Sequence, residues 1–405
     1  MSEGKSSNKK LIWYVLFAIV TVVCCYLFVV IYFFYISPYN ISLRLTFWPF
    51  STEQQIGEMY SEALVKVSYT YKADEFDDEG EEISTIGVTI SKDGFILFPY
   101  SEIDKCSDLS KIMVMTSSGT VYKGKFLYGN RDYNLALIKC ENAKNPNATI
   151  KMPFVKVYDS SDYSDISNVI VSTPKLVSSS VWTGGVEDTD YIQMFTKEVN
   201  GKEVGSYTVE GGFLIKLSGT YSFQGGAVFD SKAHLLGFSY GDTLSLGTDQ
   251  VFVLPAYAVN YFYNDVAKAY KKGNDFENDL IESLVGFDKY EADQMQRLSE
   301  AAGSEYDDMI FFGDDWQPVS SDFEMFNTSD VNGYYLFQDF IYDSIVIERD
   351  SIITSVNVNG QTEDIKYKVD LFSMLWGAKS GDKIRITYQK YESTGYRTDS
   401  LTFTV

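Results

Sequence analysis

A serine and two adjacent glycines lie close together in residues 218–230, SGTYSFQGGAVFD, just before a short apolar segment. A serine exposed in such a turn is a common way to present a hydroxyl group for nucleophilic attack. The residue directly before Gly225 and Gly226 is Gln224, however, and an amide cannot act as a nucleophile. The stretch therefore fits three interpretations: a hydrolase with a displaced serine, a hydrolase that has lost its chemistry, or an unrelated β-hairpin.

A nucleophilic serine needs a general base within hydrogen-bond reach, and the chain has a single histidine, His234. His234 follows the apolar segment at a position where a turn is expected, and we interpret it as a solvated turn residue. Lys216 is a weaker candidate base, which would form a serine–lysine dyad with Ser222.

The segments that must position these residues are short and β-like. Residues 64–255 divide into alternating apolar stretches separated by turn residues, and hairpins are expected at Lys92–Gly94 and Ser117–Gly119. Such a series predicts an all-β barrel or sandwich. A short helix is expected after Thr52, and a longer one from Ala256 to a Lys-Lys-Gly stop signal at 271–273.

The last third of the chain, residues 281–405, has a mixed α/β pattern after a linker at 271–280. We expect helices at 289–303 and 370–378, strands at 333–340 and 351–360, and a closing hairpin at 382–405. The overall fold class is therefore mainly β, followed by a smaller α/β module.

Residues 11–36 contain no charged side chain and are long enough to cross a bilayer, which needs about 20 apolar residues. Three lysines precede this run within residues 1–10, so the positive-inside rule places the N-terminus in the cytoplasm and the bulk of the chain outside. Residues 37–53 then form a juxtamembrane connector. A cleaved signal peptide is the alternative, but the run is long for one and lacks a small-residue cleavage site.

The net charge of the chain is −22, and residues 1–36 carry +2, so the remainder carries −24. This balance argues against nucleic acid as a partner. Cys106 and Cys140 are the two cysteines beyond the apolar run, and a disulfide between them is a minor alternative. Two cysteines and one histidine also argue against a structural zinc site, and we expect neither a metal nor a cofactor.

Five segments in this order resemble a membrane-anchored serine protease of the HtrA/DegP type, in which an anchor precedes a trypsin-like double β-barrel and a PDZ domain. The resemblance covers residues 54–270 well and residues 281–405 more loosely. The matching segments are GVTISKDGFILFPYSEID (Gly87–Asp104), YGNRDYNLALIKC (Tyr128–Cys140), VYDSSDYSDISNVIVSTP (Val157–Pro174), YSFQGGAVFDSKAHLLGFSYG (Tyr221–Gly241) and DQVFVLPAYAV (Asp249–Val259).

The resemblance implies that the catalytic triad is absent. The family's histidine falls on Ser101, its aspartate on Asn134 and its serine on Gln224. The triad mechanism needs a hydroxyl nucleophile, an imidazole to accept its proton and a carboxylate to orient the imidazole. All three roles are vacant, so the resemblance indicates a pseudoprotease.

The family's oxyanion loop corresponds to a remnant that includes Ser222 and Gly225. A glycine is usual at the Ser222 position, and a serine there narrows the accessible backbone angles, so we expect a collapsed oxyanion hole. A relocated hydrolytic site around Ser222 or Ser101 remains the enzymatic alternative. The alignment also places Glu102 and Asp132 near the positions of the missing triad, but a serine–carboxylate pair is a poor peptidase.

The C-terminal module resembles a divergent PDZ domain. SLVGFD (Ser283–Asp288) falls where that domain has its carboxylate-binding loop, and IVIERDSIITSVNVNG and DLFSMLWGAKSGDKIRITYQK match its later segments. In a PDZ domain a peptide's C-terminus is captured by backbone N–H groups and the peptide adds to the sheet edge. The resemblance implies peptide-binding residues at Val285, Gly286, Phe287, Leu371, Met374 and Leu375, although the three helical residues fit a core role equally well.

Taken together, the sequence predicts a single-pass extracytoplasmic pseudoprotease that binds polypeptide segments or C-termini of envelope or secreted proteins as a scaffold, sensor or regulator. The family resemblance adds a homotrimer as a possible assembly. Two other classes stay open: an active serine hydrolase with a relocated site, and a purely structural envelope protein.

Overall fold

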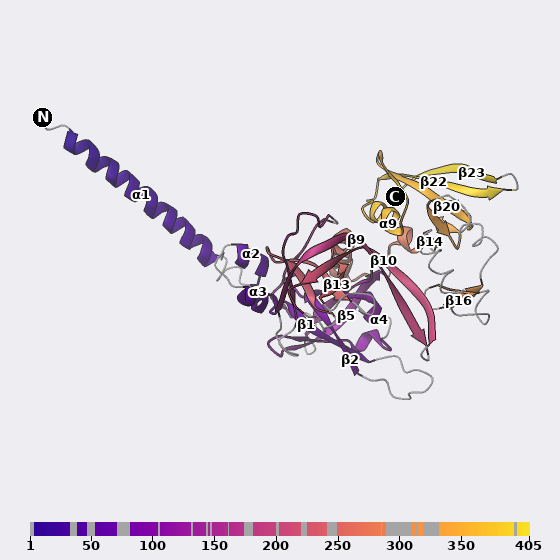
Figure 1. The fold of residues 1–405 in the computed structure, drawn as a ribbon, viewed down its shortest axis with the longest axis horizontal. Coiled ribbons are helices and arrows are strands. Elements are labelled where there is room, and N and C mark those ends of the chain that lie inside the picture. Colours follow the sequence, from indigo (N-terminus) through magenta and orange to yellow (C-terminus); the bar gives the residue numbers. More distant parts are fainter. Residues whose placement is uncertain are drawn as a thin grey trace.

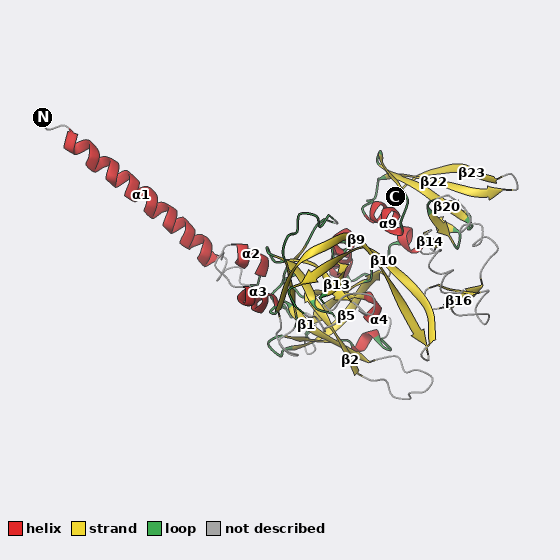
Figure 2. Cartoon of the chain, viewed as in Figure 1, coloured by secondary structure: helices red, strands yellow, loops and turns green. Residues whose placement is uncertain are grey.

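The computed structural model describes most of the chain, and Figures 1 and 2 show its arrangement. A long helix leads to a double β-barrel, and a smaller module lies at the opposite end of the molecule from this helix. The described residues are 4–32, 39–46, 53–70, 82–103, 106–130, 133–142, 145, 148–160, 162–173, 181–199, 202–219, 225–240, 249–284, 286–288, 309–312, 315–318, 332–392 and 395–405.

The N-terminal helix α1 (Gly4–Ile31) extends away from the rest of the protein (Figure 1). Its segment Ile12–Ile31 has a mean hydropathy of 2.8 and buries none of its residues. Length and composition therefore suit a membrane span, and they suit a signal sequence equally. The helices α2 (Ile41–Thr46) and α3 (Glu53–Tyr60) follow at the junction with the barrels.

The first barrel is closed by six antiparallel strands in the order β1-β2-β3-β6-β5-β4. Hairpin turns fall at the two places that the sequence predicts, between β2 and β3 and between β4 and β5. The strands are β1 (Leu64–Thr70), β2 (Glu82–Thr89), β3 (Phe95–Pro99), β4 (Met113–Thr116), β5 (Val121–Asn130) and β6 (Leu135–Glu141). β3 is buried along its whole length, and β6 is buried except for Glu141, so both strands pack against apolar neighbours on each face.

The second barrel is also closed by six strands, in the order β11-β8-β9-β10-β13-β12, because β11 and β12 pair as well. A short strand β7 adds in parallel to β12. The bounds are β7 (Lys156–Val157), β8 (Val169–Ser172), β9 (Val181–Val199), β10 (Lys202–Leu217), β11 (Ala227–Asp230), β12 (His234–Tyr240) and β13 (Gln250–Pro255). The mainly β fold with two closed barrels is therefore confirmed.

Helix α5 (Val259–Lys272) packs against β3 and β5 of the first barrel. It ends at Gly273, whose φ of 76° is left-handed, as the Lys-Lys-Gly stop signal predicts. The expected linker is shorter than 271–280. The short helix α6 (Asp279–Glu282) is capped by Asn278, whose side chain accepts a hydrogen bond from the backbone N–H of Ile281. The linker between Gly273, which ends α5, and the start of α6 is therefore residues 274–278.

The C-terminal module contains a sheet with the strand order β14-β17-β20-β22-β23, in which β21 also pairs with β20. The remaining elements are helix α9 and the hairpins β15–β16 and β18–β19. The bounds are β14 (Gly286–Asp288), β15 (Met309–Phe312), β16 (Asp315–Pro318), β17 (Tyr334–Leu336), β18 (Phe340–Tyr342), β19 (Ile345–Ile347), β20 (Ser351–Val358), β21 (Gln361–Asp364), α9 (Lys368–Trp376), β22 (Lys383–Glu392) and β23 (Gly395–Thr404). The helix expected at 289–303 lies outside the described residues.

Cys106 and Cys140 do not form a disulfide with each other. Cys106 and Cys140 are both free and both buried in the interior of the first barrel. Each behaves there as a small apolar side chain.

Candidate functional site

Ser101 and Asn134 lie next to each other at one end of the first barrel. Ser101 is in the short helix α4 (Tyr100–Ile103), which directly follows β3, and Asn134 directly precedes β6. β3 and β6 pair so that Pro99 is opposite Leu135, and this register brings the two positions together.

The side chain of Asn134 binds the backbone of Ser101. The Ser101 N–H donates to Oδ1 of Asn134 at 2.7 Å, and the Tyr100 N–H donates to the Asn134 carbonyl at 3.0 Å. Asn134 adopts a left-handed φ of 49° and is only 1% exposed. Asparagine tolerates this conformation better than other non-glycine residues, so the amide at this position fixes a tight turn.

The pair offers no acid–base chemistry. A serine hydroxyl and a carboxamide do not gain or lose protons near neutral pH, so neither can serve as a general base. Nδ2 of Asn134 is buried and has no hydrogen-bond partner among the described residues. The nearby carboxylate of Glu102 accepts a hydrogen bond from the Tyr69 hydroxyl at 2.8 Å.

The loop that resembles the family's nucleophile loop is described only from Gly225 onward. Gln224, Ser222 and Asp132 lie outside the described residues. Gly225 has a φ of 82°, which only glycine adopts without strain. Its N–H donates to the Ser239 carbonyl at 2.8 Å, and the Ser239 N–H returns a bond to the Gly226 carbonyl at 2.7 Å. The Gly225 amide is thus used within the second barrel and does not point at an oxyanion.

His234 lies in a different place from the Ser101–Asn134 pair, at the start of β12 directly after the turn from β11. Its Nδ1 is 2.9 Å from Oδ2 of Asp230. Oδ1 of Asp230 accepts the backbone N–H groups of Lys232 and His234 at 2.9 and 2.7 Å. The carboxylate therefore closes the turn and also holds the imidazole, whose side chain is 30% exposed.

This aspartate–histidine pair was missed at the sequence level, although the spacing Asp-x-x-x-His across a tight hairpin is a usable signal. Ser42 also binds this turn, since its hydroxyl donates to the Ala233 carbonyl at 2.8 Å and accepts the Lys156 N–H at 3.1 Å. Because its hydroxyl is buried and already donates to a carbonyl, Ser42 is not available as a nucleophile.

The other candidate nucleophiles and bases are also occupied. Lys216 is exposed and lies 3.8 Å from Asp249, so it faces a carboxylate partner. Burial raises the pKa of the Cys140 thiol to about 12, against the opposing effect of Lys139. A thiol with so high a pKa is a poor nucleophile at neutral pH.

In the C-terminal module, the segment that resembles a carboxylate-binding loop is partly described. Val285 and the side chain of Phe287 lie outside the described residues. Gly286 pairs with Leu336 across β14 and β17, and a Cβ at this position would lie 1.8 Å from the Tyr335 carbonyl oxygen. This close approach of two backbones explains the glycine.

Strand β14 and helix α9 are joined directly. The fully buried Asp288 accepts the Lys368 N–H at 2.9 Å, which satisfies one of the free amides at the N-terminus of α9. Leu371 and Leu375 are 0% and 1% exposed and belong to the core, whereas Met374 is half-buried. Of the three helical residues that the resemblance implies, Met374 is the one with accessible surface.

The same helix also packs against the barrels. The ring of Trp376 lies 5.7 Å from that of Tyr128 in β5 and 5.2 Å from that of Phe262 in α5. Aromatic pairs at these spacings add to the stability of an interface. α9 is therefore held between the sheet of the module and the double barrel.

No protein-family model matches this chain, and no curated protein matches it either. Among the described residues, no group of three or more histidine, cysteine, aspartate or glutamate side chains is arranged to hold a metal ion.

Proposed function

We propose that this protein is a membrane-anchored, extracytoplasmic pseudoprotease that binds polypeptide without cleaving it. In this proposal the double barrel is a degenerate relative of the HtrA/DegP type, and the C-terminal module is a divergent PDZ-like domain. The protein then acts as a scaffold, sensor or regulator of other polypeptides.

The observation that carries the proposal is the hydrogen bond between the Ser101 N–H and Asn134 Oδ1. The bond supports the alignment in which these residues occupy the positions of the family's histidine and aspartate, since those positions must adjoin. Neither side chain titrates near neutral pH. A hydrogen-bonded turn therefore occupies the positions where an active protease of this family would have its general base and the carboxylate that orients it. The single imidazole of the chain is bound to Asp230 in another turn.

Peptide binding is supported by the position of β14. It is the first strand in the order of its sheet and pairs with β17 on one side. An edge strand presents unpaired backbone groups that an extended peptide can use, and Met374 supplies an accessible apolar side chain on the adjacent helix. The captured ligand in this proposal is an extended segment or a C-terminus of an envelope or secreted protein.

A purely structural role is the second candidate, and the burial of α9 favours it. Asp288 bridges β14 to α9, and Leu371, Leu375 and Trp376 are all buried. A helix held in this way leaves little room for a ligand beside it.

The test is a screen of the full-length chain in detergent against a displayed library of free C-terminal heptapeptides, followed by calorimetric titration of the hits. We expect saturable binding in the micromolar range, weakened at least tenfold by C-terminal amidation of the peptide and by Met374→Lys. Glu363→Lys, an exposed position on β21, is the matched control and should bind as the native chain does. Absence of saturable binding for every hit would favour the structural role.

A further inference from the structure

The segment that follows the apolar helix is fastened to the barrels by its backbone. The Ile41 N–H donates to the Phe154 carbonyl at 3.0 Å, and the Phe154 N–H donates to the Tyr39 carbonyl at 2.8 Å. The Ser42 hydroxyl adds a buried bond to the Ala233 carbonyl and accepts a partly buried one from the Lys156 N–H. Ile41 itself is fully buried in the core. The connector is thus part of the folded body and fixes which face of the barrels adjoins α1.

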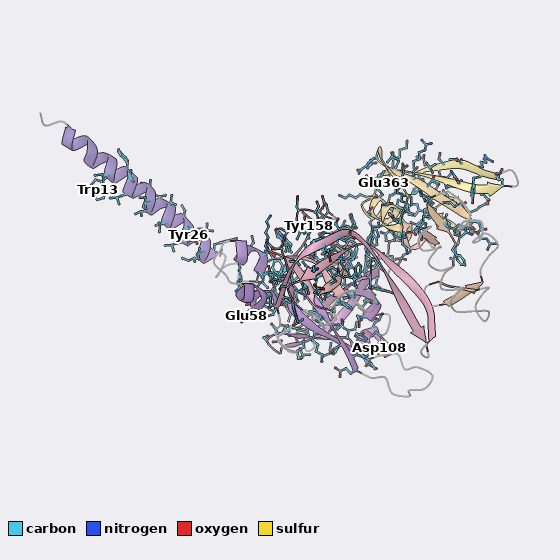
Figure 3. All side chains as sticks on the ribbon, in the orientation of Figure 1. Trp13, Tyr26, Glu58, Asp108, Tyr158 and Glu363 are labelled. Carbon is cyan, nitrogen blue, oxygen red and sulfur yellow. The ribbon has the colours of Figure 1, made fainter. Side chains whose placement is uncertain are left out.

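We define this juxtamembrane face as residues 39–46, 91–94, 148–157 and 230–234. The hydrogen bonds above join three of these segments, and the Met152 N–H donates to the Lys92 carbonyl at 2.9 Å to join the fourth. In Figure 3 the base of α1 meets the barrels on the side that bears Glu58, away from the C-terminal module.

The juxtamembrane face is basic, although the protein is acidic. It carries Arg44 and four exposed lysines against Asp93 and Asp230, a net charge of +3, while residues 37–405 as a whole carry −24. Arg44 is paired with Glu62 at 2.9 Å, and the buried Asp230 is bound to His234. The lysines are Lys92, Lys151, Lys156 and Lys232.

Chain continuity places Lys92 close to the bilayer if residues 11–36 span it. Three residues reach at most about 11 Å, which is the distance allowed between Ile36 and Tyr39. Nζ of Lys92 lies 5.3 Å from the centre of the Tyr39 ring. The headgroup layer extends roughly 5–7 Å beyond the hydrocarbon core, so Nζ of Lys92 lies at most about 15 Å from the lipid phosphates. This distance is within the Debye length of about 30 Å at 0.01 M salt.

We propose that the juxtamembrane face is a docking surface for anionic phospholipid headgroups, with Lys92, Lys151, Lys156 and Lys232 as the residues that contact the phosphates. This inference rests on the membrane anchoring in the proposed function and is independent of peptide binding. Lysines near an anionic surface are attracted to it over about a Debye length, and the effect of several is roughly additive. Glu58, an exposed acidic residue on α3 beside α2, lies at the edge of this surface.

The test uses the full-length chain in nanodiscs of phosphatidylcholine alone and of phosphatidylcholine with phosphatidylglycerol. Acylation of each lysine is followed by mass spectrometry at low ionic strength. We expect the four lysines to react about fivefold more slowly in the anionic nanodiscs, and the protection to vanish in about 1 M salt, where the Debye length is about 3 Å. Lys379 and Lys383, at the module end of the molecule, are internal controls and should react equally in both.

A matched pair of triple variants separates docking from mere tethering, with Lys92 as the reporter. K151E/K156E/K232E should abolish the lipid-dependent protection of Lys92, whereas K111E/K379E/K383E, with the same change in net charge, should leave it intact. Equal reactivity of all lysines in the two nanodiscs, with the chain still inserted, would overturn the docking surface. Failure of the chain to insert would instead refute the anchoring on which it rests.

Discussion

Asn134 is the residue at which the structure makes the most specific prediction. Its replacement by alanine removes the acceptor of the Ser101 N–H at 2.7 Å and places an alanine at a φ of 49°. An unsatisfied, partly buried N–H costs about 1–3 kcal/mol, and a left-handed non-glycine residue costs about 1 kcal/mol or more. We therefore expect Asn134→Ala to lower the free energy of unfolding by about 2–4 kcal/mol.

Glycine at the same position separates the two contributions. Asn134→Gly loses the same hydrogen bond but is free of the left-handed strain, so it should be about 1 kcal/mol more stable than Asn134→Ala. Asn134→Asp keeps the acceptor and should retain the turn, yet it should confer no hydrolysis because no imidazole lies beside it. Equilibrium urea denaturation of the full-length chain, followed by tryptophan fluorescence, measures the three differences. Native stability in Asn134→Ala would refute the view that this amide holds the turn.

Three further predictions concern packing and protonation. Trp376→Ala should destabilise the contact of α9 with the barrels by about 3–5 kcal/mol, with Trp376→Phe closer to the native chain; equal melting of all three would show that the ring does not hold the helix. With its pKa near 12, the Cys140 thiol should be alkylated about 10³-fold more slowly at pH 8 in the folded than in the urea-unfolded chain, and a difference of less than tenfold would contradict its burial. Desolvation lowers the pKa of Lys139 despite the opposing charges of Asp93, Cys140 and Glu141, so the unfolded chain binds this proton more tightly than the native chain does. The free energy of unfolding of the native chain should therefore rise relative to that of Lys139→Met as the pH rises toward the unfolded pKa near 10.5. A difference in unfolding free energy that does not change with pH would argue against this burial.

Much of the barrel architecture follows from local pattern. The turn residues Lys92–Gly94 and Ser117–Gly119 mark hairpins that the structure contains, and Gly273 ends α5 in the left-handed conformation that a Lys-Lys-Gly sequence favours. These signals are local in the chain, so composition and spacing suffice to find them. The closure of each barrel depends on pairings between distant strands, such as β1 with β4, and the sequence offered a sandwich as the alternative.

The surroundings of the candidate site were harder to foresee because they arise from contacts between segments far apart in sequence. The Ser101–Asn134 hydrogen bond needs the β3–β6 register, and the bridge from Asp288 to Lys368 spans 80 residues. The Asp230 partner of His234 is the exception, since only four residues separate the two. A solvated turn histidine was expected there, and the ring instead binds a buried carboxylate.

The most direct test of the central claim is labelling of the native full-length chain with a fluorophosphonate probe, which reacts only with an activated serine. The Ser101 N–H binds the Asn134 amide, which cannot serve as a general base, so we expect no labelling above that of the heat-denatured chain and no hydrolysis of casein. Stoichiometric labelling of the native chain that Ser101→Ala or Ser222→Ala abolishes, together with casein hydrolysis, would contradict it.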